Sequence, residues 1–203
     1  MSQLIRTPFG LATFIFLTDV NNGQFPTGQY QIDILFRKDE LTNNEDFKKL
    51  IDSANTLYRE KKGQRPDAQQ WKRWIHDLGE QGQAWYREAL ADYVRLRAKG
   101  GLRNNVPNKP EVLNHRGSKM SEPDVAAIGN GDIVRAVVSP WYNAKGNSIQ
   151  FDLHVVQFKC KGEALPEMSG ANMTQAMSLI TPVEVDAADI KVEESTDDDP
   201  FTF

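Results

Sequence analysis

Cationic and aromatic side chains gather at positions of this sequence where they could bind a polyanion. Lysine and arginine neutralise phosphates and flat rings stack on bases, and sequence-tolerant binding of single strands needs both. In the expected strand 132–142, Arg135 and Trp141 point outward, with Tyr142 beside the following loop and Lys145 at its tip. The predicted DNA-binding set also takes in the end of a neighbouring strand and a polar loop, with Arg37, Lys38, Arg103, Lys109, Arg116 and Lys119.

Other aromatic residues favour packing over base contact. Tyr30 and Phe36 share a strand face with two isoleucines, so we expect both in the core. Whether Trp141 lies at the surface or in the core stays open. Its strand face carries Arg135, which favours the surface, and Val137, which favours the core. Helical spacing favours packing within a helical segment for three tryptophans, Trp71, Trp74 and Trp85.

The charge of the chain is divided unevenly along its length. The whole chain has 24 Lys and Arg against 28 Asp and Glu, a net charge of −4. Residues 182–203 hold eight acids and one base, a net charge of −7, so residues 1–181 hold 23 bases and 20 acids, a net charge of +3. Residues 59–119 alone hold 14 bases against 7 acids. A basic body with an acidic tail is typical of proteins that interact with nucleic acid.

Catalytic constellations are missing from the sequence. His76, His115 and His154 lack metal-ligand spacing, and the single Cys160 cannot build a zinc site. There is no glycine-rich phosphate loop before a helix and no nucleophile elbow. We therefore expect no enzyme activity, no metal and no cofactor.

The C-terminal end combines carboxylates with aromatic rings. In residues 197–203, three aspartates stay solvated and Pro200 disfavours a helix or a central strand. We therefore expect this segment to add nothing to a folded core. A disordered acidic leash with a hydrophobic anchor is typical of a docking peptide for another protein. The alternative is a solubility tail, which has no need of terminal phenylalanines. The predicted partner-binding residues are Asp197, Asp198, Asp199, Phe201 and Phe203.

Length and composition indicate one globular domain with an elaboration. The 203 residues are 39% hydrophobic and 26% charged, enough to bury a core. No run of 18 apolar residues and no signal peptide occurs, so we expect no membrane association. The lone cysteine fits a reducing compartment, which predicts a cytoplasmic protein.

Alternating hydrophobicity predicts long strands at both ends of the folded body. We expect strands over residues 4–20, 29–37, 132–142 and 148–161, with the last two joined as a hairpin. The apolar alternation slips at Val155 and Val156, which predicts a bulge. A further strand is expected at 102–106 or 110–114.

Helical patterns fill the region between these strands. Thr42 to Glu45 have capping-box spacing and start one helix, and residues 67–99 are helical by pattern. The fold class is therefore mainly β with α insertions (α+β), an OB-fold-like antiparallel barrel with a helical insertion at about residues 40–99. The domain boundaries are 1–181 for the barrel and 182–203 for the disordered tail.

Several segments resemble a family of bacteriophage single-stranded-DNA-binding proteins with an OB-fold. The resemblance covers about half of the chain, and the tryptophan-rich residues 67–99 depart from the short forms of the family. It is carried by Thr7-Pro8-Phe9-Gly10 through Phe36-Arg37-Lys38, by Asn108 to Leu113, and by Gly131 to Asn147 with Phe151-Asp152-Leu153.

The tail is similar to the acidic tip of bacterial single-stranded-DNA-binding proteins and phage helix-destabilising proteins. That resemblance implies recruitment of replication and recombination enzymes. The chain departs from the bacterial pattern because Thr202 and Phe203 follow Phe201, which leaves open which ring is the anchor.

Together these features predict a phage protein that coats single-stranded DNA and can self-associate along it, in the host cytoplasm. One rival is a protein-interaction or recombination-mediator module whose tryptophans form the functional surface. A second rival is a nuclease, which the missing metal ligands disfavour.

Overall fold

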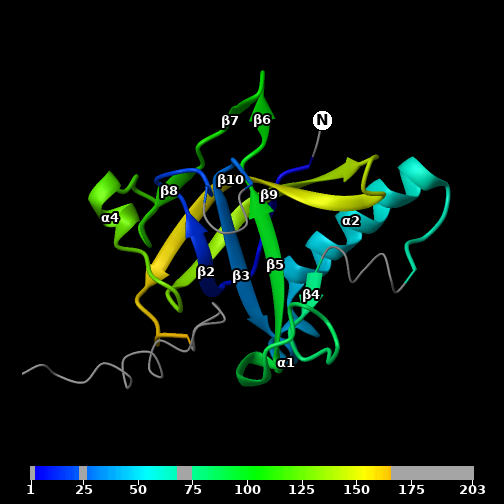
Figure 1. Ribbon diagram of the computed structural model, residues 1–203, viewed down its shortest axis with the longest axis horizontal. Coiled ribbons are helices and arrows are strands. Elements are labelled where there is room, and N and C mark those ends of the chain that lie inside the picture. Colours follow the sequence, from blue (N-terminus) through cyan, green and yellow to red (C-terminus); the bar gives the residue numbers. More distant parts are fainter. Residues whose placement is uncertain (1–2, 23–26, 68–74, 166–203) are drawn as a thin grey trace, which may run out of the picture. The chain divides into compact units, whose positions relative to one another are not determined.

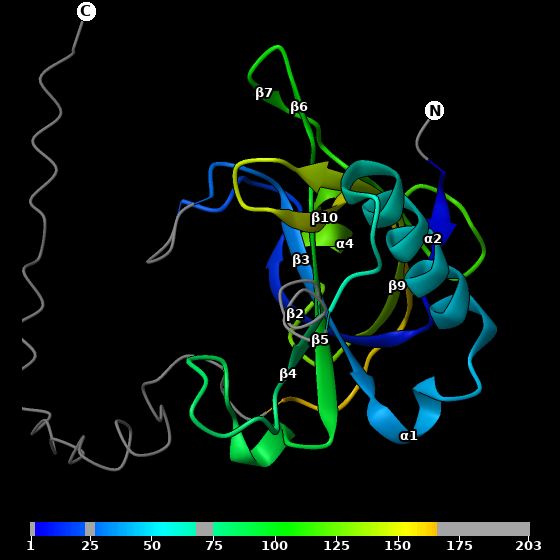
Figure 2. The same cartoon turned by 90° about the vertical axis from the view of Figure 1, so that its right-hand side faces the viewer.

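Five strands close into a barrel in the computed structural model, which describes residues 3–22, 27–67 and 75–165 (Figures 1 and 2). All neighbours in this ring pair antiparallel except β5 and β10, which are parallel. A closed five-stranded barrel of this kind is an OB-fold, so the predicted fold is confirmed, with one parallel seam in an otherwise antiparallel ring. In circular order the strands are β9 (Ile133–Asn143), β2 (Gly10–Phe16), β3 (Gln31–Arg37), β5 (Tyr93–Lys99) and β10 (Ser148–Cys160), which pairs with β9 again.

Alternation along the strands fills the barrel with apolar side chains. In β3, Ile32, Ile34 and Phe36 point inward and are almost fully buried. Tyr30, expected beside them, lies just before β3 and is only half-buried. The inward residues of the other strands include Leu96, Ala98, Val134, Ala136, Val138, Phe151 and Leu153.

The β9–β10 hairpin is the longest paired element of the barrel, with strands of 11 and 13 residues. Its register shifts between Leu153 and Val155, so the predicted bulge is confirmed. The bulge changes the parity of the outward face, which carries Asp152 and His154 before it and Gln157 after it.

Short strands extend the sheet beyond the ring. The predicted first strand is divided at Pro8, which has no N–H to donate, into β1 (Ile5–Arg6) and β2. The other short strands are β4 (Ile75–Asp77), paired with β5, and β8 (Glu111–Leu113), paired with β10, while β6 (Leu102–Arg103) and β7 (Val106–Pro107) form a separate hairpin that stands out from the barrel (Figures 1 and 2).

One long helix packs beside the barrel. The helix α2 (Glu45–Lys62) begins slightly later than the capping-box spacing predicts, because its cap is Asn44 instead of Thr42. Asn44 Oδ1 accepts a hydrogen bond from the Phe47 N–H at 3.0 Å. Gly63 ends it in the left-handed conformation, with φ of 70°. Its buried face packs against β9 and β1. The shorter helical elements are α1 (Lys38–Leu41), the 3₁₀ helix η1 (Glu88–Leu90) and α4 (Glu122–Ala126).

The helix predicted over residues 67–99 is wrong for its described part. Residues 75–99 form β4, η1 and β5 instead. The strand signal in Tyr93 to Lys99 is a strict alternation that buries Leu96 and Ala98 in the barrel. The wider spacing of the aromatic residues favours a helical face, but pairing of β5 with β3 along seven positions determines the conformation.

The fifth strand of the barrel is therefore β5. The sequence predicts a further strand at residues 102–106 or 110–114, and neither segment belongs to the five-stranded ring. Both segments do contain short strands, since β6 starts at Leu102 and β8 lies within the second. Trp71 and Trp74, the expected boundary at residue 181 and the acidic tail 182–203 lie outside the described residues. Within the described part of the chain, no helix is long and apolar enough to cross a membrane.

Candidate functional site

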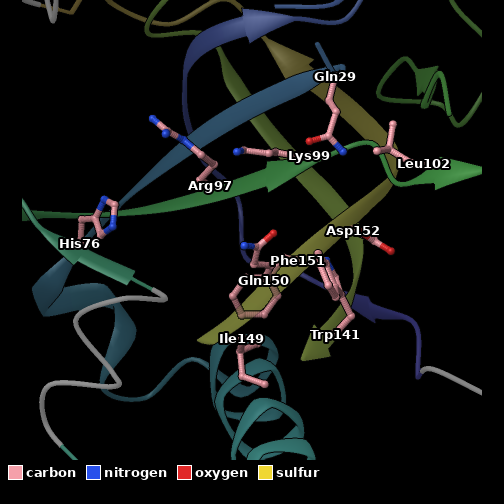
Figure 3. Close-up of a pocket in the computed structure, with 10 residues that line it drawn as sticks. All are labelled: Gln29, His76, Arg97, Lys99, Leu102, Trp141, Ile149, Gln150, Phe151 and Asp152. Atoms are coloured by element: carbon pink, nitrogen blue, oxygen red, sulfur yellow. The ribbon is translucent and has the colours of Figure 1, made fainter. Parts of the chain in front are cut away.

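A groove lies where β5 and β10 separate on the barrel wall. The two strands pair only at Lys99 and Asp152. From Val94 to Leu96, the edge of β5 pairs with β4 instead. A pocket of about 370 Å³ lies between β5 and the β9–β10 hairpin (Figure 3). Its lining residues are Gln29, His76, Arg97, Lys99, Leu102, Trp141, Ile149, Gln150, Phe151 and Asp152.

Three cations occupy alternate positions on the outer face of β5. Arg95, Arg97 and Lys99 face outward because the residues between them fill the barrel. Figure 3 shows Arg97 and Lys99 projecting from β5 at one side of the groove. A row of positive charge with a two-residue repeat can follow the phosphates of an extended strand.

A fully buried carboxylate on β3 holds the two arginines in place. Arg97 donates to Asp33 from both Nε and Nη2, each at 2.9 Å from its nearer oxygen. Arg95 Nε lies 3.6 Å from the same carboxylate, and its side chain is 9% exposed. Two cations share one anion, so the cluster keeps a net positive charge, and the more exposed Arg97 presents it to the groove.

Lys99 presents a positive charge that no described group neutralises. It makes no ion pair within the described residues, although it is the register partner of Asp152. Burial and the nearby Arg97 lower the pKa of the Lys99 ammonium from its usual value, whereas Asp33 raises it. An incoming phosphate would supply the counter-charge that this half-buried cation lacks.

A stacked pair of rings stands at the β4 end of the groove. The His76 and Trp85 rings lie 4.5 Å apart at 13°, and the Trp85 Nε1–H donates to the Asp77 carbonyl at 3.0 Å. Burial, with help from Arg95 and Arg97, lowers the pKa of His76 to about 4. His76 is therefore neutral at pH 7, and its Nδ1 accepts a hydrogen bond from Arg95 Nη2.

Trp141 lies on the opposite side of the groove, on β9. Its side chain is 38% exposed, and its register partner is Gln150 on β10. The neighbouring Phe151 is almost completely buried and fills the core at this position, so the core does not need the Trp141 side chain. A partly exposed indole across a groove from a cationic row is a platform on which a base can stack.

The other residues predicted on the hairpin do not line the groove. Tyr142 turns toward α2, where its ring lies 6.2 Å from that of Tyr58 and its hydroxyl donates to Asn147. Lys145 is exposed at the tip of the turn. Arg135 lies over the Phe9 ring at 4.4 Å, farther along β9.

Five of the remaining predicted cations lie beside acidic or polar partners at the surface, and none of these five lines the groove. Arg103 is on β6, and the structure describes its backbone only. The partners are Asp39 for Arg37, Asp77 for Lys38, Glu122 for Lys109, His115 for Arg116 and Glu111 for Lys119.

The cationic row is not among the residues predicted from the sequence, because the pattern of residues 67–99 is interpreted as a helix. The signal that finds it is the alternation in Tyr93-Val94-Arg95-Leu96-Arg97-Ala98-Lys99, which places every base on one face of a strand. In the described part of the chain, no group of three or more His, Cys, Asp or Glu side chains could hold a metal ion.

Known structures share this fold, although no family model matches the sequence and no curated protein matches it. The single-stranded DNA-binding protein from bacteriophage Enc34 matches with a TM-score of 0.62 at 20% identity, over 86% of this chain and 89% of that one. The same protein in complex with ssDNA matches with a TM-score of 0.60 at 19% identity, over 80% and 89%. A single-stranded DNA binding protein encoded by bacteriophage T7, gp2.5, matches with a TM-score of 0.57 at 15% identity, over 91% and 99%. The barrel is thus similar to phage single-stranded-DNA-binding proteins, in agreement with the resemblance in the sequence.

Proposed function

We propose that this protein binds single-stranded DNA, largely without regard to sequence, in the groove between β5 and the β9–β10 hairpin. The observation that carries the proposal is the juxtaposition of Arg97 and Lys99 on one side of the groove with Trp141 on the other. The cations neutralise phosphates while the indole stacks on a base, and bases are free to stack in this way only in an unpaired strand. That the Enc34 protein of similar fold was solved with ssDNA supports the proposal.

The surface cations predicted from the sequence remain part of this proposal as flanking contacts. The ion pairs of Lys109 and Lys119 are exposed, so a phosphate can replace the carboxylate at little energetic cost. Arg135 and Lys145 lie at opposite ends of the hairpin and would extend the path of the strand in either direction. The flanking cations are Arg37, Lys38, Arg103, Lys109, Arg116, Lys119, Arg135 and Lys145, and the aromatic Tyr142 completes the predicted set.

In this role the protein coats DNA during phage replication or recombination in the host cytoplasm and catalyses no reaction. Self-association along the DNA and recruitment of replication or recombination proteins complete the proposal. Binding draws on phosphate neutralisation, which releases counterions from DNA and makes the affinity depend on salt.

The expected result of titrating the protein with labelled oligo-dT is tight binding that weakens as salt rises. The logarithm of the binding constant should fall with the logarithm of salt concentration by about 0.7 per phosphate contacted. Fluorescence anisotropy at two or more salt concentrations measures this slope. No binding at micromolar protein, or binding that salt does not alter, would refute the proposed function.

The acidic tail is proposed to dock partner proteins and to compete with DNA for the basic body. Truncation after Val185 leaves 23 bases and 21 acids, a net charge of +2, and removes a tethered polyanion that resembles a DNA backbone. We expect the truncated protein to bind oligo-dT more tightly than the full chain, most clearly at low salt where screening is weak.

Deletion of residues 201–203 alone is the matched control for that truncation, because it keeps every tail carboxylate side chain. Its affinity for DNA should stay close to that of the full chain, since only the rings are lost. Weaker DNA binding after truncation at Val185 would mean that the tail belongs to the folded or assembled state, which contradicts its proposed role.

A further inference from the structure

The groove contains a carboxylate that phosphate binding does not explain. Asp152 is on β10, lines the groove, and is the register partner of Lys99 on β5 and of Ser139 on β9. Within the described residues, its carboxylate makes no hydrogen bond and no ion pair. The neighbouring His154 donates to or accepts from Ser139 instead.

Asp152 is in an environment that disfavours its charge. Burial raises the pKa of its carboxyl group, an effect that His154 partly opposes. A negative charge in this position also repels the phosphates that Arg97 and Lys99 attract. A half-buried carboxylate without a donor is costly to keep, so the bound ligand is the natural source of the missing donors.

Space beside the carboxylate is kept open by the absence of a side chain at Gly101. A Cβ atom at Gly101 would lie 3.2 Å from Asp152 Oδ2. The pocket of about 370 Å³ has room for a flat ring, and Trp141 and Gln150 line it beside Asp152. Figure 3 shows Asp152 and Trp141 on neighbouring strands of the same side of the groove.

We propose that Asp152 reads one base of the bound strand by accepting hydrogen bonds from its N–H groups, and that guanine is the base it prefers. This inference rests on the proposed binding of single-stranded DNA. An ionised carboxylate only accepts hydrogen bonds, and its two oxygens match the adjacent N1–H and N2–H donors of guanine. Thymine offers one N–H between two carbonyl oxygens, which repel a carboxylate. Aspartate and glutamate accept from the amino groups of bases in protein–DNA complexes in the same way.

The test compares three oligonucleotides of about 12 nucleotides, within the range of about 4 to 16 that one OB-fold covers. One is all thymine, and the others carry a single central guanine or a single central inosine, which lacks only the N2 amino group. Fluorescence anisotropy should show the guanine strand bound about tenfold more tightly than the other two. This ratio lies within the discrimination between bases that a good bidentate hydrogen-bonded pair provides.

The variant Asp152→Ala should abolish the preference for guanine. The guanine strand should lose its roughly tenfold advantage, while the all-thymine and inosine strands should bind slightly more tightly because one repulsive charge is gone. Asp52→Asn is the matched control: it removes a carboxylate from the exposed surface of α2, outside the groove, and should keep the preference. If Asp152→Ala does not fold, as judged by thermal denaturation, the nearly isosteric Asp152→Asn serves in its place, with the same loss of preference for guanine over inosine expected.

Equal affinity of the wild-type protein for all three strands would overturn the role of Asp152 and leave the proposed function standing. Retention of the guanine preference in the Asp152 variants would also overturn it. Failure to bind any of the three strands would instead refute the proposed function itself.

Discussion

Replacement of Asp33 by alanine is expected to lower the free energy of unfolding by about 3–5 kcal/mol, because it removes the anion from a buried ion cluster. Asp33 is fully buried between two arginines, and Arg95 is itself only 9% exposed. Arg95 Nε already has no hydrogen-bond acceptor among the described residues, so without the nearby carboxylate the Arg95 guanidinium would keep only the neutral His76 as a partner. An unpaired buried cation is far more costly than the loss of a surface contact.

Denaturant unfolding of wild type and Asp33→Ala measures this loss directly. Asp39→Ala is the matched control. Asp39 on α1 pairs with Arg37 at the exposed end of β3, so its removal should change the free energy of unfolding little. Equal stability of wild type and Asp33→Ala would show that the arginines on β5 do not depend on Asp33 for their placement.

Replacement of Trp141 by alanine is expected to weaken binding of single-stranded DNA by about 1–3 kcal/mol, the usual contribution of one ring that stacks on a base. The indole is 38% exposed and lies in the groove, while the apolar residues on either side of it in the sheet fill the barrel without it. Its removal should therefore cost affinity and leave the melting temperature nearly unchanged.

Affinity for oligo-dT and thermal stability must be measured on the same protein preparations. Trp141→Phe keeps a flat ring and should retain part of the lost affinity, which a purely structural role would not predict. If Trp141→Ala lost thermal stability before it lost affinity, the ring would be a core residue and would not be a platform for bases.

The sequence was sufficient to predict the parts of the fold that depend on local pattern. The β9–β10 hairpin and its first bulge follow from alternation that is interrupted at Val155. The start of α2 follows from a polar cap ahead of a helical apolar face. These signals lie within a few residues of one another, so they can be recognised without knowledge of the tertiary structure.

The site was harder to predict because it depends on pairing between distant strands. Closure of the barrel at Lys99 and Asp152 joins positions 53 residues apart in the sequence, and nothing local to either residue indicates it. Once residues 93–99 are known to form a strand, their alternation places Arg95, Arg97 and Lys99 on one face. The surface ion pair between Lys109 and Glu122 likewise depends on the fold. The sequence therefore could not separate paired cations from Lys99, which has no ion-pair partner in the part of the chain that the structure describes.

The most direct test of the central claim is the salt dependence of oligo-dT binding, measured side by side for wild type, Lys99→Ala and Lys49→Ala. Lys49 is exposed on α2 and lines a different pocket, so it controls for the loss of one positive charge. If the β5 groove binds the strand, Lys99→Ala should bind more weakly at low salt, with a slope smaller by about 0.7, and Lys49→Ala should match wild type. Identical slopes for wild type and Lys99→Ala would contradict the claim that DNA lies in this groove.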